Sequence, residues 1–378
     1  MSKLKHVVIV FEPETACRDH LARHGYPDHL ASEIATYLAQ ATDLEDFEEE
    51  IRGALAAEGL GVTFTTLAEA PEALLRADPE HTIVWCQTDG VRFYRGSSIP
   101  ALARLLGLAR YGSPPAAQHL CQDKFGSLAL AAGAGLPIPP TRLLEGATTM
   151  AALRESDLDW DSATLFVKPA TLGAKLGIFA DSRCVGMEAA ARLGQRIWDR
   201  YADRAIVQAY IAGDDIRVSY MDTGKRFESQ VGVGRLRKNS ASETSGAFMT
   251  MQDNETLSGA GDTQGSRNRF GRAHDAAFTP EMDDLRTTDD SRGKAAACLV
   301  MVYADRLRRL ISLQDYFSMD FRLDAEGRPI FFEFEVCPAV TIYDFQHYLA
   351  NTHGLNLGPA LARSLLIAFE RYRSQAEA

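Results

Sequence analysis

The feature that most constrains this chain is a pair of apolar segments near its C-terminus that carry three acids. The segments 317–324 and 330–336 flank Ala325-Glu326-Gly327-Arg328, which is typical of a tight turn. The pattern predicts an antiparallel hairpin. Asp320 lies on the first strand, and Glu333 and Glu335 lie two residues apart on the second, so those two share one face. We expect all three carboxylates to face the same way.

Three carboxylates on one face of an apolar hairpin repel one another and lose hydration, so the pattern favours a bound cation. Hard oxygen ligands suit Mg²⁺, which usually also keeps waters and phosphate oxygens. The alternative is an exposed strand face whose acids have no function. Four aromatic neighbours favour the metal site over that alternative: Phe321, Phe331, Phe332 and Phe334.

A second candidate is Lys168, at the end of the apolar strand predicted over 163–169. A lysine at the mouth of a buried strand beside a glycine turn is well placed for a phosphate. In the turn 172–177, Gly173 and Gly177 allow a ligand to approach the backbone closely, and Lys175 adds charge. The pattern matches neither the P-loop nor the dinucleotide fingerprint. A strand-end lysine that reaches solvent is the alternative.

Two weaker candidates stand on either side of this strand. Lys124, in Gln122-Asp123-Lys124-Phe125, is by itself equally well a surface lysine at a helix start. In the segment 208–215, Gln208 and the backbone of Ala209 to Ile211 can read an adenine edge, and Asp215 can accept hydrogen bonds from a ribose. Alone, this segment is only a strand that leads into a turn.

Strands alternate with helices along the N-terminal third, which predicts a βαβ sheet and an α/β fold. We expect strands over 6–11, 61–67 and 82–87, with one helix over 29–58. Further along, we expect a short helix over 150–157, a return strand over 178–180 and a strand over 227–234. The polar stretch 238–292 is either a lid that closes on ATP binding or a loop without function. The predicted parts are 1–115, 116–212 and 213–378.

The four candidates occur in an order that resembles the ATP-grasp superfamily, most closely the D-alanine:D-alanine ligase branch. The resemblance covers about 121–338 and includes a 13-residue step from Asp320 to Glu333. The matching pieces are QDK at 122–124, GLPIPPT at 135–141, FVKPATLGAKLGI at 166–178, VQAYIAGDDIRV at 207–218, DFRLDAEGRPIFFEFE at 320–335, and Pro338. The resemblance implies a Rossmann-like pre-ATP-grasp domain, a central α+β lid subdomain and a C-terminal α+β catalytic subdomain.

The resemblance also implies a role for each candidate. Lys124 and Lys168 contact the ATP phosphates, and the loop of Gly173, Lys175 and Gly177 closes over them. The remaining roles are adenine binding by Gln208, Ala209 and Ile211, ribose binding by Asp215, and binding of one or two Mg²⁺ ions, which Mn²⁺ can replace, by Asp320, Glu333 and Glu335.

The activity implied is an ATP-dependent carboxylate–amine ligase that forms an acyl phosphate from a small carboxylate and passes the acyl group to an amine. Three alternatives remain open: an acceptor that is not an amine, an intramolecular cyclisation, and a nucleotide-binding protein without turnover. The resemblance also implies a homodimer.

The substrate side departs from the branch. Glu335 stands where Asn is usual, Ser318 where an Arg serves the tetrahedral oxyanion, and Ala339 where Gly is usual. We therefore do not expect the product to be D-alanyl-D-alanine. Arg322 is the first candidate to supply the missing cation, because it alternates onto the strand face of Asp320. Arg235 and Lys238 are further catalytic candidates.

The composition excludes several other classes. The net charge of −11 over 378 residues argues against binding to nucleic acid or to a membrane surface. The six cysteines show no CxxC pair or zinc spacing, and we read them as reduced core residues. No stretch reaches the roughly 18 apolar residues of a membrane span. These features indicate a cytoplasmic protein.

Overall fold

The N-terminal sheet is parallel, as the sequence predicts. The computed structural model describes residues 3–88, 95–154, 158–237 and 281–376. The strands run in the order β2-β1-β3-β4, with bounds β1 His6–Phe11, β2 Gly61–Thr66, β3 Thr82–Cys86 and β4 Ala109–Tyr111. Helices connect them: α1 Glu14–Arg23, α2 Asp28–Thr42, the 3₁₀ turn η1 Glu45–Phe47, α3 Glu48–Ala57, α4 Ala70–Arg76 and α5 Arg95–Leu105.

The prediction of one continuous helix over 29–58 is wrong. The chain leaves α2 at Asp43, whose backbone is extended, and re-enters a helix only at Glu48. The break lets Leu44 bury completely beneath the sheet beside Ile51 and Leu55. Burial of these side chains outweighs an unbroken run of helical hydrogen bonds.

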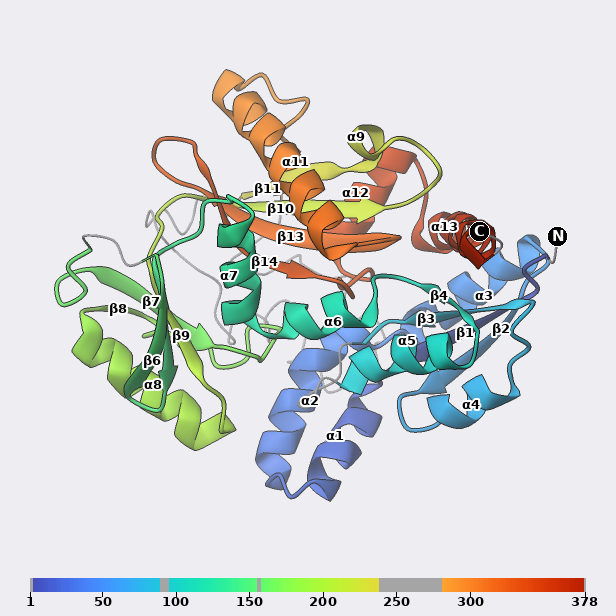
Figure 1. Ribbon diagram of the computed structural model, residues 1–378, viewed down its shortest axis with the longest axis horizontal. Coiled ribbons are helices and arrows are strands. Elements are labelled where there is room, and N and C mark those ends of the chain that lie inside the picture. Colours follow the sequence, from blue (N-terminus) through green and yellow to red (C-terminus); the bar gives the residue numbers. More distant parts are fainter. Residues whose placement is uncertain (1–2, 89–94, 155–157, 238–280, 377–378) are drawn as a thin grey trace, which may run out of the picture.

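The middle sheet is antiparallel, in the order β6-β5-β9-β7-β8 (Figure 1). Its strands are β5 Thr141–Glu145, β6 Thr148–Leu153, β7 Thr164–Pro169, β8 Arg183–Val185 and β9 Ala205–Ala209. The helices of this part are α6 Pro115–Gln122, α7 Lys124–Gly133 and α8 Met187–Tyr201. The predicted helix over 150–157 is wrong, because residues 148–153 pair with β5 as a strand. The return strand lies at 183–185 and not at 178–180.

The third sheet carries the acidic hairpin. Its order is β12-β11-β10-β13-β14, and its strands are β10 Asp214–Met221, β11 Gly232–Arg237, β12 Glu281–Asp284, β13 Tyr316–Leu323 and β14 Pro329–Glu335. Its helices are α9 Phe227–Gln230, α11 Ser291–Ile311, α12 Tyr343–His353 and α13 Leu357–Ala376. The strand expected over 227–234 is therefore a helical turn followed by β11. The segment 281–292 of the expected loop includes a strand and the start of α11, and residues 238–280 lie outside the described part.

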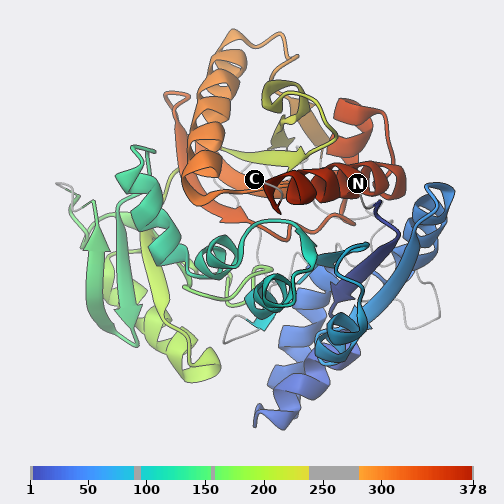
Figure 2. The ribbon, with the colours of Figure 1, turned by 45° about the vertical axis from the view of Figure 1, so that its right-hand side comes forward.

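Helix α13 returns to the opposite end of the chain. It packs against α3 and β4, next to the N-terminal sheet (Figures 1 and 2). Leu361, Leu365 and Phe369 of α13 share one apolar core with Ile9 and Trp85 of that sheet. The last helix thus covers a face of the first sheet. None of the described helices is long and apolar enough to cross a bilayer.

A half-buried histidine ties the end of α12 to the turn that follows β10. The two ring nitrogens of His353 lie 3.2 Å from the Thr223 hydroxyl and 3.0 Å from the Tyr348 hydroxyl. The Tyr348 hydroxyl also donates to the Gln230 carbonyl and accepts from the Met221 amide. Burial, together with the nearby Lys225 and Arg363, lowers the pKa of His353 to about 4.

We predict that this histidine makes the fold sensitive to acid. A histidine whose pKa is depressed in the folded state contributes stability that is complete above the unfolded value of about 6.5 and is lost as the pH falls toward 4. Urea unfolding at pH 7.5 and pH 5.0 should show a smaller loss of unfolding free energy for His353→Gln than for the wild type. Equal losses in the two proteins would contradict the prediction.

Candidate functional site

A cavity of about 440 Å³ is lined by residues from the N-terminal part and from the middle and third sheets. The middle part contributes Phe166, Lys168 and the segment 208–211, and the third sheet contributes side chains of β10, β13 and β14. The N-terminal part adds Glu12 and the end of α2. Most of the predicted phosphate, adenine and metal residues therefore line one space, although Lys124 and Gly177 are not among its described lining residues.

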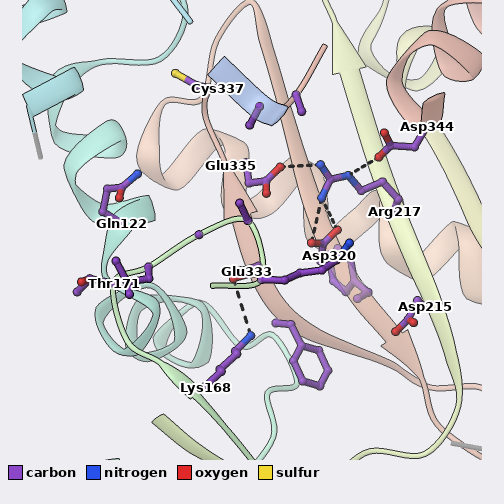
Figure 3. Close-up of a pocket in the computed structure, with 18 of the residues that line it drawn as sticks. Gln122, Lys168, Thr171, Asp215, Arg217, Asp320, Glu333, Glu335, Cys337 and Asp344 are labelled. Carbon is purple, nitrogen blue, oxygen red and sulfur yellow. Dashed lines mark hydrogen bonds and ion pairs between the residues drawn. The ribbon is translucent and has the colours of Figure 1, made fainter. Parts of the chain in front are cut away.

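Two lysines from different elements converge on one acid. The Nζ atoms of Lys124 and Lys168 each lie 3.8 Å from Oε2 of Glu333 (Figure 3 shows Lys168). Both lysines are 8% exposed. Lys124 begins α7, which Asp123 caps by accepting from the amides of Phe125 and Gly126. Burial lowers the pKa of Lys168, and Glu333 opposes that shift. Two buried cations with one carboxylate between them leave positive charge for an anionic ligand.

The glycine turn lies beside these lysines. Lys124 Nζ donates to the Leu172 carbonyl at 2.7 Å, so the lysine also holds the turn. Gly173 and Lys175 line the cavity. Gly177 is not among the described lining residues, and its φ is +72°. A Cβ added there would lie 2.4 Å from Pro169 Cγ, so packing within the turn is what requires this glycine.

The predicted adenine residues Gln208, Ala209 and Ile211 line the other end of the cavity, with the predicted ribose residue Asp215 beside them. Gln208 is fully buried, and its Nε2 donates to the Thr141 hydroxyl at 3.2 Å. Its Oε1 has no hydrogen-bond partner among the described residues. A buried acceptor without a partner is costly, so this end of the cavity suits a ligand that carries an amino group.

The three predicted catalytic cations do not gather at the acids. Arg322 lines the cavity, but its Nε lies 2.6 Å from Asp215 Oδ1 and its Nη1 donates to the Ile211 carbonyl at 2.8 Å. It is therefore held at the predicted nucleotide end. Arg235 pairs with Asp214 and Asp290, outside the described cavity lining. Lys238 lies outside the described residues. Catalytic roles for all three remain predictions.

The cation that does meet the acids is Arg217, which the sequence reasoning missed. Its Nη1 contacts both Asp320 oxygens at 2.8 and 3.0 Å, its Nη2 contacts Glu335 at 2.6 Å, and its Nε lies 3.1 Å from Asp344 Oδ2 (Figure 3). The strand register places Arg217 directly opposite Asp320. The available signal was its position two residues after Asp215, which puts both on one face of β10.

The electrostatics of the acids reflect their burial. The pKa of Asp320 is raised to about 7, mainly by burial; Arg217 opposes the rise, and Glu335 and Glu333 add to it. Burial also favours a protonated Glu333, but Lys168, Lys124 and Arg217 together lower the pKa of that carboxyl. Burial raises the pKa of Asp344, with Arg217 again opposing. Asp320, Glu333 and Asp344 are thus desolvated, and the cations beside them favour their charged forms, an effect that outweighs burial only at Glu333.

The donor set fits Mg²⁺ in kind, because Asp320, Glu333 and Glu335 are carboxylates at the mouth of a phosphate-type pocket. As they lie, no three His, Cys or acidic side chains within the described ranges form a group that could hold a metal ion. Arg217 engages two of the predicted ligands, and the lysines engage the third. A metal would therefore bind in competition with these cations.

We predict that Arg217→Met destabilises the protein by about 3–5 kcal/mol, because it leaves buried carboxylates without a counter-charge. Mg²⁺ should raise the melting temperature of this variant more than that of the wild type, since the acids are then free to bind it. The test is thermal unfolding with and without MgCl₂. Arg309→Met is the matched control, because Arg309 is 71% exposed and pairs only near the surface with Asp305. An equal response to Mg²⁺ in Arg217→Met and wild type would contradict the competition.

Comparisons with known sequences give limited matches. No family model matches this sequence. A D-alanine–D-alanine ligase of Verminephrobacter eiseniae is 29% identical over 133 residues, which are 35% of this chain and 38% of that protein. Another, of Gloeobacter violaceus, is 27% identical over 173 residues, which are 44% of this chain and 54% of that protein. The chain thus matches less than two thirds of the length of these relatives.

The structural match extends over the whole chain. The D-alanine–D-alanine ligase of Bacillus anthracis, solved as a complex with ATP, matches 98% of this chain and 99% of its own, with a TM-score of 0.59 at 11% identity. The predicted resemblance and the predicted fold class are confirmed.

Proposed function

Because the chain has the ATP-grasp fold of the D-alanine–D-alanine ligases, we propose that it is an ATP-dependent carboxylate–amine ligase. The observation that carries the proposal is the convergence of Lys124 and Lys168 on Glu333, beside Asp320 and Glu335. A phosphate chain with its metal needs both kinds of charge at one place. The cavity supplies them at one end and an adenine-sized polar and apolar surface at the other.

In this proposal the nucleotide lies between the middle and third sheets. Phe166 and Phe332 bound the adenine, Gln208 Oε1 accepts from its amino group, and Asp215 binds the ribose. Lys124 and Lys168 bind the phosphates, and the turn at Gly173 and Lys175 covers them. The B. anthracis ligase named above was solved with ATP, which supports this assignment.

The reaction proceeds in two balanced steps. A carboxylate oxygen of the acid attacks the γ-phosphorus, the bond to the bridging oxygen breaks, and ADP leaves with an acyl phosphate formed. The amine nitrogen then attacks the acyl carbon, the bond from that carbon to the phosphate oxygen breaks, and inorganic phosphate leaves and takes up the proton that the nitrogen gives up. Asp320, Glu333 and Glu335 would hold one or two Mg²⁺ ions, which neutralise phosphate charge when bound. The chain's own part is to position the reactants and to exclude water.

Arg217 is the cation that we assign to the reaction centre. It lies among the proposed metal ligands, whereas Arg322 is engaged by Asp215. Preorganised donors at a developing oxyanion lower the barrier substantially. Ser318, which stands where the ligase branch carries an arginine, donates instead to Glu335 at 2.8 Å. The different source of the cation supports a substrate pair other than two D-alanines.

The test is ADP release by purified protein with MgATP across a matrix of amino acids, small carboxylates and amines, with products identified by mass spectrometry. We expect release to require one acid and one amine and to yield their amide. The variant Asp320→Asn, Glu333→Gln should lower turnover by at least about 10²-fold, because it removes ligand charge at the phosphoryl group. Asp305→Asn, on α11 outside the cavity, is the matched control and should retain wild-type turnover.

Other outcomes separate the alternatives. Consumption of a single substrate with loss of water from its mass would indicate an intramolecular cyclisation, and a product without a new C–N bond would indicate an acceptor that is not an amine. ATP binding without ADP release across the matrix would favour a nucleotide-binding protein without turnover. Unchanged turnover in the double variant would contradict the proposed metal ligands. The homodimer, cytoplasmic location and lid role of 238–292 remain predictions.

A further inference from the structure

Asp344 is a buried acid in the cavity that no part of the proposed function uses. It lies in the first turn of α12, not on the acidic hairpin. Its side chain is 13% exposed, and its Oδ2 lies 3.1 Å from Arg217 Nε, an ion pair without a hydrogen bond, since Nε has no hydrogen-bond partner among the described residues. Its Oδ1 is buried and has no hydrogen-bond partner in the part of the chain that the structure describes. Burial of a carboxylate is costly unless a cation compensates it, so the ion pair with Arg217 is what supports this residue here.

Each of the three acids around Arg217 contacts a different nitrogen of its guanidinium. Asp320 contacts Nη1 and Glu335 contacts Nη2, whereas Asp344 faces Nε on the opposite edge (Figure 3). The first two are proposed metal ligands. Asp344 comes from another element, and its position on the Nε edge leaves both Nη atoms clear of it.

This division has a consequence when MgATP binds. Asp320 and Glu335 would coordinate the metal in place of pairing with Arg217, and the metal itself would repel the guanidinium. A long, flexible side chain that loses two partners beside a new positive charge would leave unless a third partner held it. We infer that Asp344 is a positioning residue that keeps Arg217 at the reaction centre in the loaded enzyme, an inference that rests on the proposed function.

The support behind Asp344 is rigid enough for this role. The next residue, Phe345, is fully buried, and Tyr348 one turn later is 4% exposed and hydrogen-bonded to both β10 and Gln230. Helix α12 therefore cannot shift without exposing its core face. Held at Nε, Arg217 directs Nη1 and Nη2 toward the phosphoryl group and the developing oxyanion. Fixed orientation of a donor is what makes it effective in catalysis.

The test is a double-mutant cycle on positions 344 and 217. Wild type, Asp344→Asn, Arg217→Ala and the double variant are titrated with MnATP by calorimetry, a readout that needs neither acid nor amine. Where ADP release is found, kcat and KM for MgATP are measured on the same four proteins. Asn has nearly the shape of Asp, so the first change removes the charge and little volume. Urea unfolding of each protein confirms that it is folded under the assay conditions.

We expect Asp344→Asn to weaken MnATP binding by about 10-fold and to lower kcat by about 10–100-fold, the range found for residues that orient a ligand or donor. In the Arg217→Ala background the same change should have less than about 2-fold effect, because the residue it positions is gone. Equal losses in both backgrounds would overturn the positioning role and leave Asp344 as a general source of negative charge. A folded wild type that binds no MnATP would overturn the proposed function, and the inference with it. ATP binding without ADP release would contradict only the ligase activity. The double-mutant cycle measured on MnATP binding would still decide the role of Asp344.

Discussion

The guanidinium of Arg217, on β10, contacts three consecutive elements that come much later in the chain, namely β13, β14 and α12. Each of these elements brings a carboxylate to the same place, and burial raises the pKa of Asp320 and Asp344 there while Arg217 opposes that rise. Arg217 thereby links the first turn of α12 to the hairpin. The order of the cavity wall depends in turn on α12, because Ile342 and Ala339 line the cavity just before that helix. Charge compensation and shape are thus set by the same contact.

Much of the scaffold could be predicted from the sequence, because its signals are local. The hairpin, the parallel strands of the N-terminal sheet and the strand that ends at Lys168 all follow from apolar runs and turn residues. The secondary-structure predictions that are wrong concern segments whose conformation is set by tertiary pairing. Residues 148–153 contain good helix formers, yet they form a strand that pairs with the free edge of β5. Within the hairpin itself, an irregularity pairs Phe321 with Phe331 and leaves Phe332 out of the register, which no pattern of alternation indicates.

The candidate site divides in the same way. Lys124, Lys168, Asp320 and Glu333 could be identified because each follows a recognisable local sequence and the four occur in a familiar order. Arg217 and Asp344 could not, since their meeting depends on the register of β10 against β13 and on where α12 packs. Arg322 illustrates the converse error. Alternation predicts its strand face correctly, but the residue opposite it on β10 is Asp215, which pairs with it at the nucleotide end.

The packing of α13 on the N-terminal sheet bears on how the protein is made. The face of the sheet that holds Ile9, Trp85 and Tyr111 receives its cover from Leu361, Leu365 and Phe369, about 250–350 residues later in the chain. At ribosomal rates of about 5–20 residues per second, that face waits tens of seconds for its partner. During this interval only Leu44, Ile51 and Leu55 of the residues already synthesised cover that face from α3 and the turn before it. The N-terminal part is therefore exposed to aggregation while the rest of the chain is made, even though it is synthesised first.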